Sequence, residues 1–157
     1  MATFFSNLLN IGELNKWASL LDWLFDGDKF NNWDPNKVTR FTKRLKNQLG
    51  LGDYNYIHAS YKNLTFPKRL KKGEVIVISG SQLSEGKDLV RHIRNGIAHG
   101  NARIISDNGY WIELKDFKMS KRNKTEQKEN NQTAYIYFPI EYVFKIFDLY
   151  KEIKKQK

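Results

Sequence analysis

Residues 84–100, SEGKDLVRHIRNGIAHG, contain a clear helical pattern of apolar side chains. Leu89, Ile93 and Ile97 recur every fourth residue, which places them on one face of a helix. At about 3.6 residues per turn, the opposite side collects polar residues. These are Asp88, Arg91, His92, Asn95 and His99, with Arg94 at the edge of the apolar stripe. Gly100 suits the left-handed position after a helix. We therefore predict an amphipathic helix whose polar face lies away from the core.

Further helices are predicted on both sides of this stretch. We expect them over residues 11–25, 34–49 and 53–64, and from Pro139 past Ile153. In the second, Asp34 is placed to cap the N-terminus, Pro35 suits the first turn and Gly50 suits the end. The apolar residues expected to face the core in the third are Tyr54, Ile57, Tyr61 and Leu64.

Strand signals are confined to the middle of the chain. The β-branched run 75–78 predicts a short buried strand, and residues 103–114 predict a hairpin around Asn108-Gly109. Residues 115–132 predict a flexible polar loop, and residues 133–138 a third strand. The sequence thus predicts one mainly α domain over residues 1–157, with a small antiparallel sheet or hairpin insertion around residues 102–138.

The net charge of +10 is unevenly distributed along the chain. Residues 37–72 carry ten Lys or Arg against Asp53 alone. Such a basic segment attracts polyanions such as RNA, and we expect Arg40, Lys43 and Arg44 on the second helix to contact it. The alternative is an ordinary solvated face, because twenty of the 27 basic residues are Lys and the excess can reflect composition alone.

The composition excludes several kinds of site. The chain has no cysteine, which excludes a disulfide framework and a thiol nucleophile. No cluster of residues has metal-ligand spacing, so we expect neither a metal nor a cofactor. The hydrophobic residues 4–25 are interrupted by polar ones and lack the features of a signal peptide. We therefore expect no membrane span and a cytoplasmic location.

The segment Arg94-Asn95-Gly96-Ile97-Ala98-His99 resembles the motif of the HEPN family, in which an Arg and a polar residue precede a His on one helix. The resemblance implies a helical bundle in which two motifs meet across a homodimer interface and cleave RNA without a metal. It implies catalytic roles for Arg94, Asn95 and His99. We expect the adjoining Arg91 and His92 to contact RNA. Family members also serve as toxins or anti-phage effectors, some with a small nucleotidyltransferase as antitoxin.

These side chains suit cleavage through a ribose 2′-OH. His99 supplies an imidazole, the side chain that most often serves as a general acid or base, and the Arg94 guanidinium suits a phosphate. Each of the three residues also has a structural alternative. His99 can be an ordinary histidine at a helix end, Arg94 an arginine at the rim of the core, and Asn95 a residue that only contacts a dimer partner. Asp88, Arg91 and His92 can form a solvated face or a dimer salt-bridge network, and His58 is assigned a structural role. We expect an endoribonuclease. The alternative is a non-catalytic HEPN-like module that binds RNA, a nucleotide or a partner protein.

Overall fold

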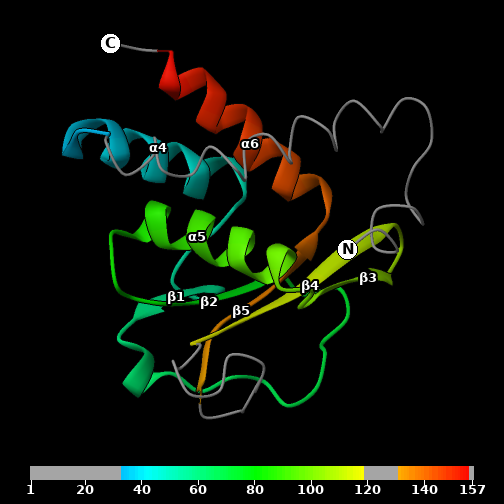
Figure 1. Ribbon diagram of the computed structural model, residues 1–157. Helices are drawn as coiled ribbons and strands as arrows, with labels where there is room; N and C mark the ends of the chain where they lie inside the picture. The colour runs from blue at the N-terminus through cyan, green and yellow to red at the C-terminus, as the bar shows by residue number, and fades with distance from the viewer. Residues whose placement is uncertain (1–32, 119–130, 156–157) are drawn as a thin grey trace.

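The computed structural model describes residues 33–118 and 131–155, which form a mixed sheet covered by helices (Figure 1). The sheet has five strands in the order β1-β2-β5-β4-β3. Strands β1 and β2 are parallel, and the other neighbours are antiparallel. The strands are β1 (Tyr56–Ala59), β2 (Ile76–Gly80), β3 (Ala102–Ser106), β4 (Tyr110–Phe117) and β5 (Gln132–Pro139).

The helices stack in two layers on one face of the sheet. Helix α5 (Glu85–Ala98) lies on strands β2 and β4, as Figure 1 shows. Helices α4 (Pro35–Gln48) and α6 (Glu141–Lys154) contact each other beyond α5. Within residues 33–118 and 131–155, no helix is long and apolar enough to cross a membrane.

The prediction of a mainly α bundle with a small sheet insertion is wrong. The described residues form three α-helices and a five-stranded mixed sheet, so the sheet is a full structural layer. Its central strand β5 is buried from Thr133 to Phe138. The hairpin and the strand after it were correctly placed in sequence. The hairpin and β5 join β2 and β1 in one sheet because β5 pairs with β2. This pairing links strands far apart in the chain, so no periodicity in the local sequence indicates it.

The predicted helix over residues 53–64 is also wrong. This segment contains β1 and a short 3₁₀ turn, Tyr61–Asn63. Two of the residues expected in the core are exposed instead, Tyr54 at 87% and Ile57 at 47%. The backbone of β1 pairs with β2 from Tyr56↔Val77 to Ala59↔Gly80. Hydrogen bonding to a distant strand therefore outweighs the local helical spacing.

The helices predicted as α4 and α6, the cap of α4 and the hairpin turn are confirmed, with α6 beginning at Glu141 rather than at Pro139. Asp34 accepts a hydrogen bond from the backbone N–H of Lys37 at 2.9 Å and caps α4. Asn108 and Gly109 have φ values of 47° and 118° at the hairpin turn. The predicted loop over residues 115–132 is shorter than expected, because β4 extends to Phe117 and β5 begins at Gln132. The helix predicted at residues 11–25 and the loop residues 119–130 lie outside the described ranges.

A glycine allows α5 to lie close to the sheet. A Cβ added at Gly96 would lie 2.5 Å from both Cγ and Cδ2 of Leu114, which is on β4. No side chain fits at that distance without displacing Leu114. The close approach brings the neighbouring Asn95 within reach of β4.

Candidate functional site

A row of side chains from four adjacent strands faces helix α5. The sheet register aligns His58 with Ser79, Ser79 with Ala134, and Ala134 with Asp116. Residues directly opposite each other in a sheet project to the same face. His58 and Asp116 both contact α5, so the whole row lies beneath that helix.

The side chains between α5 and this row form a polar layer, which consists of His58, Asp88, Arg91, His92 and Asp116. Asp88, in the first turn of α5, is the centre of its first half. Its carboxylate is fully buried, and its Oδ2 lies 2.8 Å from Nε2 of His58. The backbone N–H groups of Gln82 and Leu83 donate to it at 3.1 and 3.0 Å. Arg91 donates to its Oδ1 from Nη2 at 2.9 Å. A buried carboxylate is thus surrounded by donors from the strand, the loop and the helix.

These donors determine the ionisation of Asp88. Burial by itself raises the pKa of the carboxyl group, because it disfavours the charged form. The hydrogen bonds from His58 and Arg91, and then those from the backbone of Leu83 and Gln82, outweigh burial and lower the pKa below its ordinary value. Asp88 is therefore an anion that contributes to stability through its partners.

His92 and Asp116 form the second half of the layer. His92 is fully buried, and its Nδ1 lies 2.8 Å from Oδ2 of Asp116. Its Nε2 lies 3.0 Å from the backbone oxygen of Gly80 and 3.4 Å from Nη2 of Arg91. A chain of polar contacts therefore runs from His58 through Asp88 and Arg91 to His92 and Asp116, with Nε2 of His92 facing both Arg91 and the Gly80 carbonyl.

The predicted catalytic residues lie at the end of this chain. Nδ2 of Asn95 lies 3.4 Å from Oδ2 of Asp116, and Oδ1 of Asn95 accepts from Nη1 of Arg94 at 3.3 Å. Asn95 is half-buried, whereas Arg94 and His99 are exposed. His99 is the C-cap of α5, and its backbone N–H bonds to the carbonyl of Asn95 at 2.9 Å. The chain thus presents the exposed side chains of Arg94 and His99 near the C-terminal end of one helix.

The polar face of α5 is not as the sequence predicted. Asp88 and His92 were expected on a face turned to solvent or to a dimer partner, yet both are 0% exposed. Helix α5 is buried on two sides, against the sheet and against α4, so its polar stripe lies on the polar row of the sheet. His92 is consequently removed from the residues expected to contact RNA. Arg91 stays partly exposed, with 27% of its side chain accessible.

Of the predicted basic residues on α4, two are exposed and one is paired. Arg40 and Lys43 are exposed. The guanidinium of Arg44 forms a bidentate ion pair with Glu152 of α6, in which Nη1 donates to Oε1 at 2.9 Å and Nη2 to Oε2 at 3.2 Å. Part of the positive charge predicted for this face is therefore balanced within the fold.

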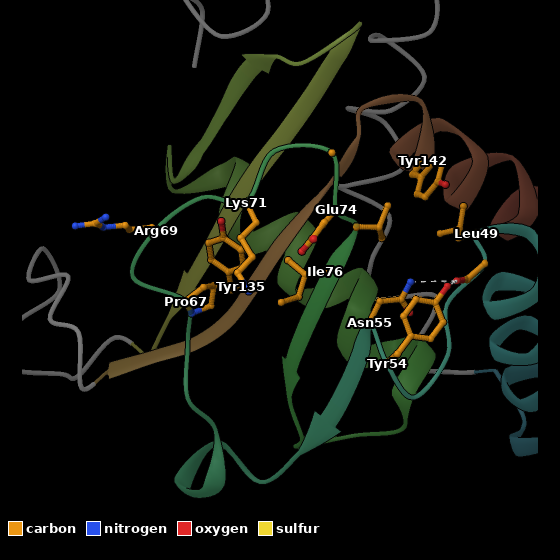
Figure 2. Close-up of a pocket in the computed structure, with 13 residues that line it drawn as sticks. Leu49, Tyr54, Asn55, Pro67, Arg69, Lys71, Glu74, Ile76, Tyr135 and Tyr142 are labelled. Atoms are coloured by element: carbon orange, nitrogen blue, oxygen red, sulfur yellow. Dashed lines mark hydrogen bonds between the residues drawn. The ribbon is translucent and has the colours of Figure 1, made fainter.

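A separate groove of about 750 Å³ lies near the N-terminal ends of β1 and β2 (Figure 2). Its lining includes Tyr54, Tyr135 and Tyr142, and it contains none of the motif residues. The hydroxyl of Tyr135 donates to Oε2 of Glu113 at 2.7 Å, which fixes that ring. The groove and the motif are thus distinct features of the surface.

The sequence did not indicate the role of Asp116, and His58, which was assigned a structural role, is a partner of the buried Asp88. Asp116 lay in the predicted flexible loop, and His58 in the helix that does not form. One signal was present for Asp116: Ile112 and Leu114 alternate toward α5, and one further step of that alternation reaches residue 116. Nothing in the sequence near His58 indicates that it meets Asp88, because the contact joins two separate elements.

The family model described as HEPN pEK499 p136 matches residues 5–157 of the chain. The match includes the whole polar layer and the segment from Arg94 to His99. No curated protein and no solved structure gives a significant match.

Proposed function

Because this chain belongs to the HEPN pEK499 p136 family, we propose that it is a metal-independent endoribonuclease with a site formed by Arg94, Asn95 and His99. HEPN domains are commonly ribonucleases. The observation that carries the proposal is the arrangement at the end of α5. There Arg94 and His99 are exposed and Asn95 is anchored to a buried carboxylate.

Each side chain has a role in cleavage through the 2′-OH. The His99 imidazole moves a proton, either from the attacking 2′-hydroxyl or to the departing 5′-oxygen. The Arg94 guanidinium binds the phosphate oxygens and stabilises the charge that develops on them. Asn95 fixes the position of Arg94 through the 3.3 Å hydrogen bond.

The reaction calls for a base and an acid, and one motif supplies a single His. We therefore propose that two protomers bring their copies of Arg94 and His99 together across a two-fold axis. The face between them consists of the exposed groups at the C-terminal end of α5. The buried Asp88 and His92 are not part of it.

The dimer has a direct test. Light scattering at micromolar concentration should give about twice the 18.5 kDa mass of one chain. The Arg94→Ala variant serves as a control for whether the motif itself contributes to association. A monomer at all concentrations that support cleavage would contradict the composite site.

The surroundings of the site suggest which residues contact RNA. We propose that the exposed Arg40 and Lys43 on α4 contact RNA, together with Arg91 and Arg44, which are partly exposed and already paired with Asp88 and Glu152. A cytoplasmic toxin or anti-phage role, with a small nucleotidyltransferase as antitoxin, is proposed from the family resemblance alone.

The mechanism predicts specific products. Cleavage should proceed in excess EDTA and leave 2′,3′-cyclic phosphate and 5′-hydroxyl ends, because a His base activates the 2′-OH of the RNA itself. DNA and 2′-O-methyl RNA of the same sequence are matched controls and should resist. Mass spectrometry of the fragments is the measurement. A requirement for magnesium, or 5′-phosphate ends, would contradict this mechanism. RNA binding without any cleavage would favour the non-catalytic module.

A further inference from the structure

The Asn95 carboxamide lies between two oppositely charged groups. Its Nδ2 lies 3.4 Å from Oδ2 of Asp116, and its Oδ1 accepts from the Arg94 guanidinium at 3.3 Å. The amide nitrogen only donates and the amide oxygen only accepts. The Asp116 carboxylate and the Arg94 guanidinium therefore both favour the same orientation of the amide, with Nδ2 toward Asp116 and Oδ1 toward Arg94. Asn95 connects a surface cation to a buried anion.

Asp116 is itself fixed in position. It is 3% exposed, and its Oδ1 accepts from the backbone N–H of Phe117 at 2.9 Å. Its Oδ2 is shared between Nδ1 of His92 and Nδ2 of Asn95. His92 is fully buried, with its other ring nitrogen 3.0 Å from the carbonyl of Gly80. The anchor of Asn95 thus belongs to the sheet and has little freedom to move.

We propose that Asp116, supported by His92, is a positioning residue of the ribonuclease site, which orients Asn95 and through it the Arg94 guanidinium. This inference rests on the proposed function, because it assigns a role within the site of Arg94, Asn95 and His99. The hydrogen bond from Arg94 to Asn95 limits the rotamers of the arginine, and fixing a catalytic group before the phosphate arrives lowers the entropic part of the barrier.

A purely structural role for Asp116 makes a different prediction. If Asp116 only served as a hydrogen-bond partner of buried His92, substitution of Asp116 would affect folding, and the effect would be the same with or without Asn95. If Asp116 acts through Asn95, its effect on catalysis disappears once Asn95 is gone. The double-mutant cycle between the two positions separates these cases.

The first variant is Asp116→Asn in the full chain. The carboxylate accepts on both oxygens, so a carboxamide in its place turns an N–H group toward Phe117 or toward His92 and Asn95. We expect kcat to fall roughly 10- to 100-fold with little change in KM. In the Asn95→Ala background, Asp116→Asn should cause almost no further loss of kcat. Equal losses in both backgrounds would overturn the proposal.

The second variant is Asn95→Asp, which leaves the Asp116–His92 pair intact and serves if Asp116→Asn fails to fold. It places two carboxylates together, so it should lower kcat more than Asn95→Ala does. Exchanging the two groups in the double variant Asn95→Asp/Asp116→Asn restores one carboxylate and one carboxamide with an unchanged total charge. It should recover part of the lost kcat. A kcat of Asn95→Asp that is equal to or above that of Asn95→Ala would overturn the proposal. So would a double variant whose kcat does not recover.

A readout without catalysis separates this proposal from the proposed function. The side-chain NH₂ signals of Asn95 in ¹⁵N-labelled protein report its hydrogen bond to Asp116. In Asp116→Asn these signals should shift toward those of a solvated amide, and the Arg94 Nε signal should shift with them. Wild-type protein that cleaves no RNA would contradict the ribonuclease. Asn95 and Arg94 signals unchanged by Asp116→Asn would contradict the positioning role.

Discussion

His99→Ala is expected to lower RNA cleavage by roughly 10²- to 10⁴-fold, the contribution typical of a general acid or base. The proposed composite site uses the His99 of both protomers, so the variant removes the acid and the base together. His99→Gln should be equally inactive, because an amide donates and accepts hydrogen bonds but does not transfer a proton at neutral pH. The initial rate of cleavage of a labelled RNA is the measurement.

Stability should be unaffected by the same change. His99 is exposed and contributes its backbone, not its side chain, to the hydrogen bond with Asn95. Substitutions at such positions shift the free energy of unfolding by less than about 0.5 kcal/mol. A matched control is Lys145→Ala, which removes one exposed side chain from α6 and should leave cleavage unchanged. Full activity in His99→Ala, or a large fall in its melting temperature, would contradict the proposed role.

Asp88→Asn is expected to produce the largest loss of stability. The fully buried carboxylate accepts from His58, Arg91 and two backbone N–H groups, and a carboxamide removes its charge and one of its acceptors. Breaking a buried charge pair by changing one partner costs about 3–5 kcal/mol. At roughly 2–4 °C per kcal/mol for a chain of this size, the melting temperature should fall by about 10 °C.

The loss should depend on pH in one direction. The pKa of Asp88 is lower in the folded protein than its ordinary value of 3.8. Its contribution is therefore complete above the unfolded pKa and is lost as pH falls through the folded pKa. Wild type and Asp88→Asn should differ fully at pH 7 and converge as pH falls below 3.8 and through the lowered pKa of Asp88. Urea unfolding at several pH values measures this difference.

A matched control is Asp148→Asn, at an exposed carboxylate on α6. It should change the free energy of unfolding little at any pH. If Asp88→Asn were as stable as this control at pH 7, the polar layer would not contribute to stability as its geometry implies.

Elements with local signals could be predicted from the amino-acid sequence alone. The spacing of Leu89, Ile93 and Ile97 predicts α5, and Gly100 predicts its end. The cap at Asp34 and the turn at Asn108-Gly109 were predicted in the same way. Helical periodicity also placed the side chains of Arg94 and His99 outside the core, where the structure has them. All of these depend on interactions within a few turns of the backbone.

The sheet and the surroundings of the site depend on contacts between residues far apart in the sequence. Strand β1 forms because β2 supplies its hydrogen bonds, although residues 53–64 have helical spacing. Asp88 and His92 are buried because His58 on β1 and Asp116 on β4 form hydrogen bonds with them. These hydrogen bonds offset the free-energy cost of removing polar groups from water. Such partners lie dozens of residues away, and no local pattern encodes which residues will meet. The motif is thus a local property of α5, whereas the anchor beneath Asn95 exists only once the sheet has formed.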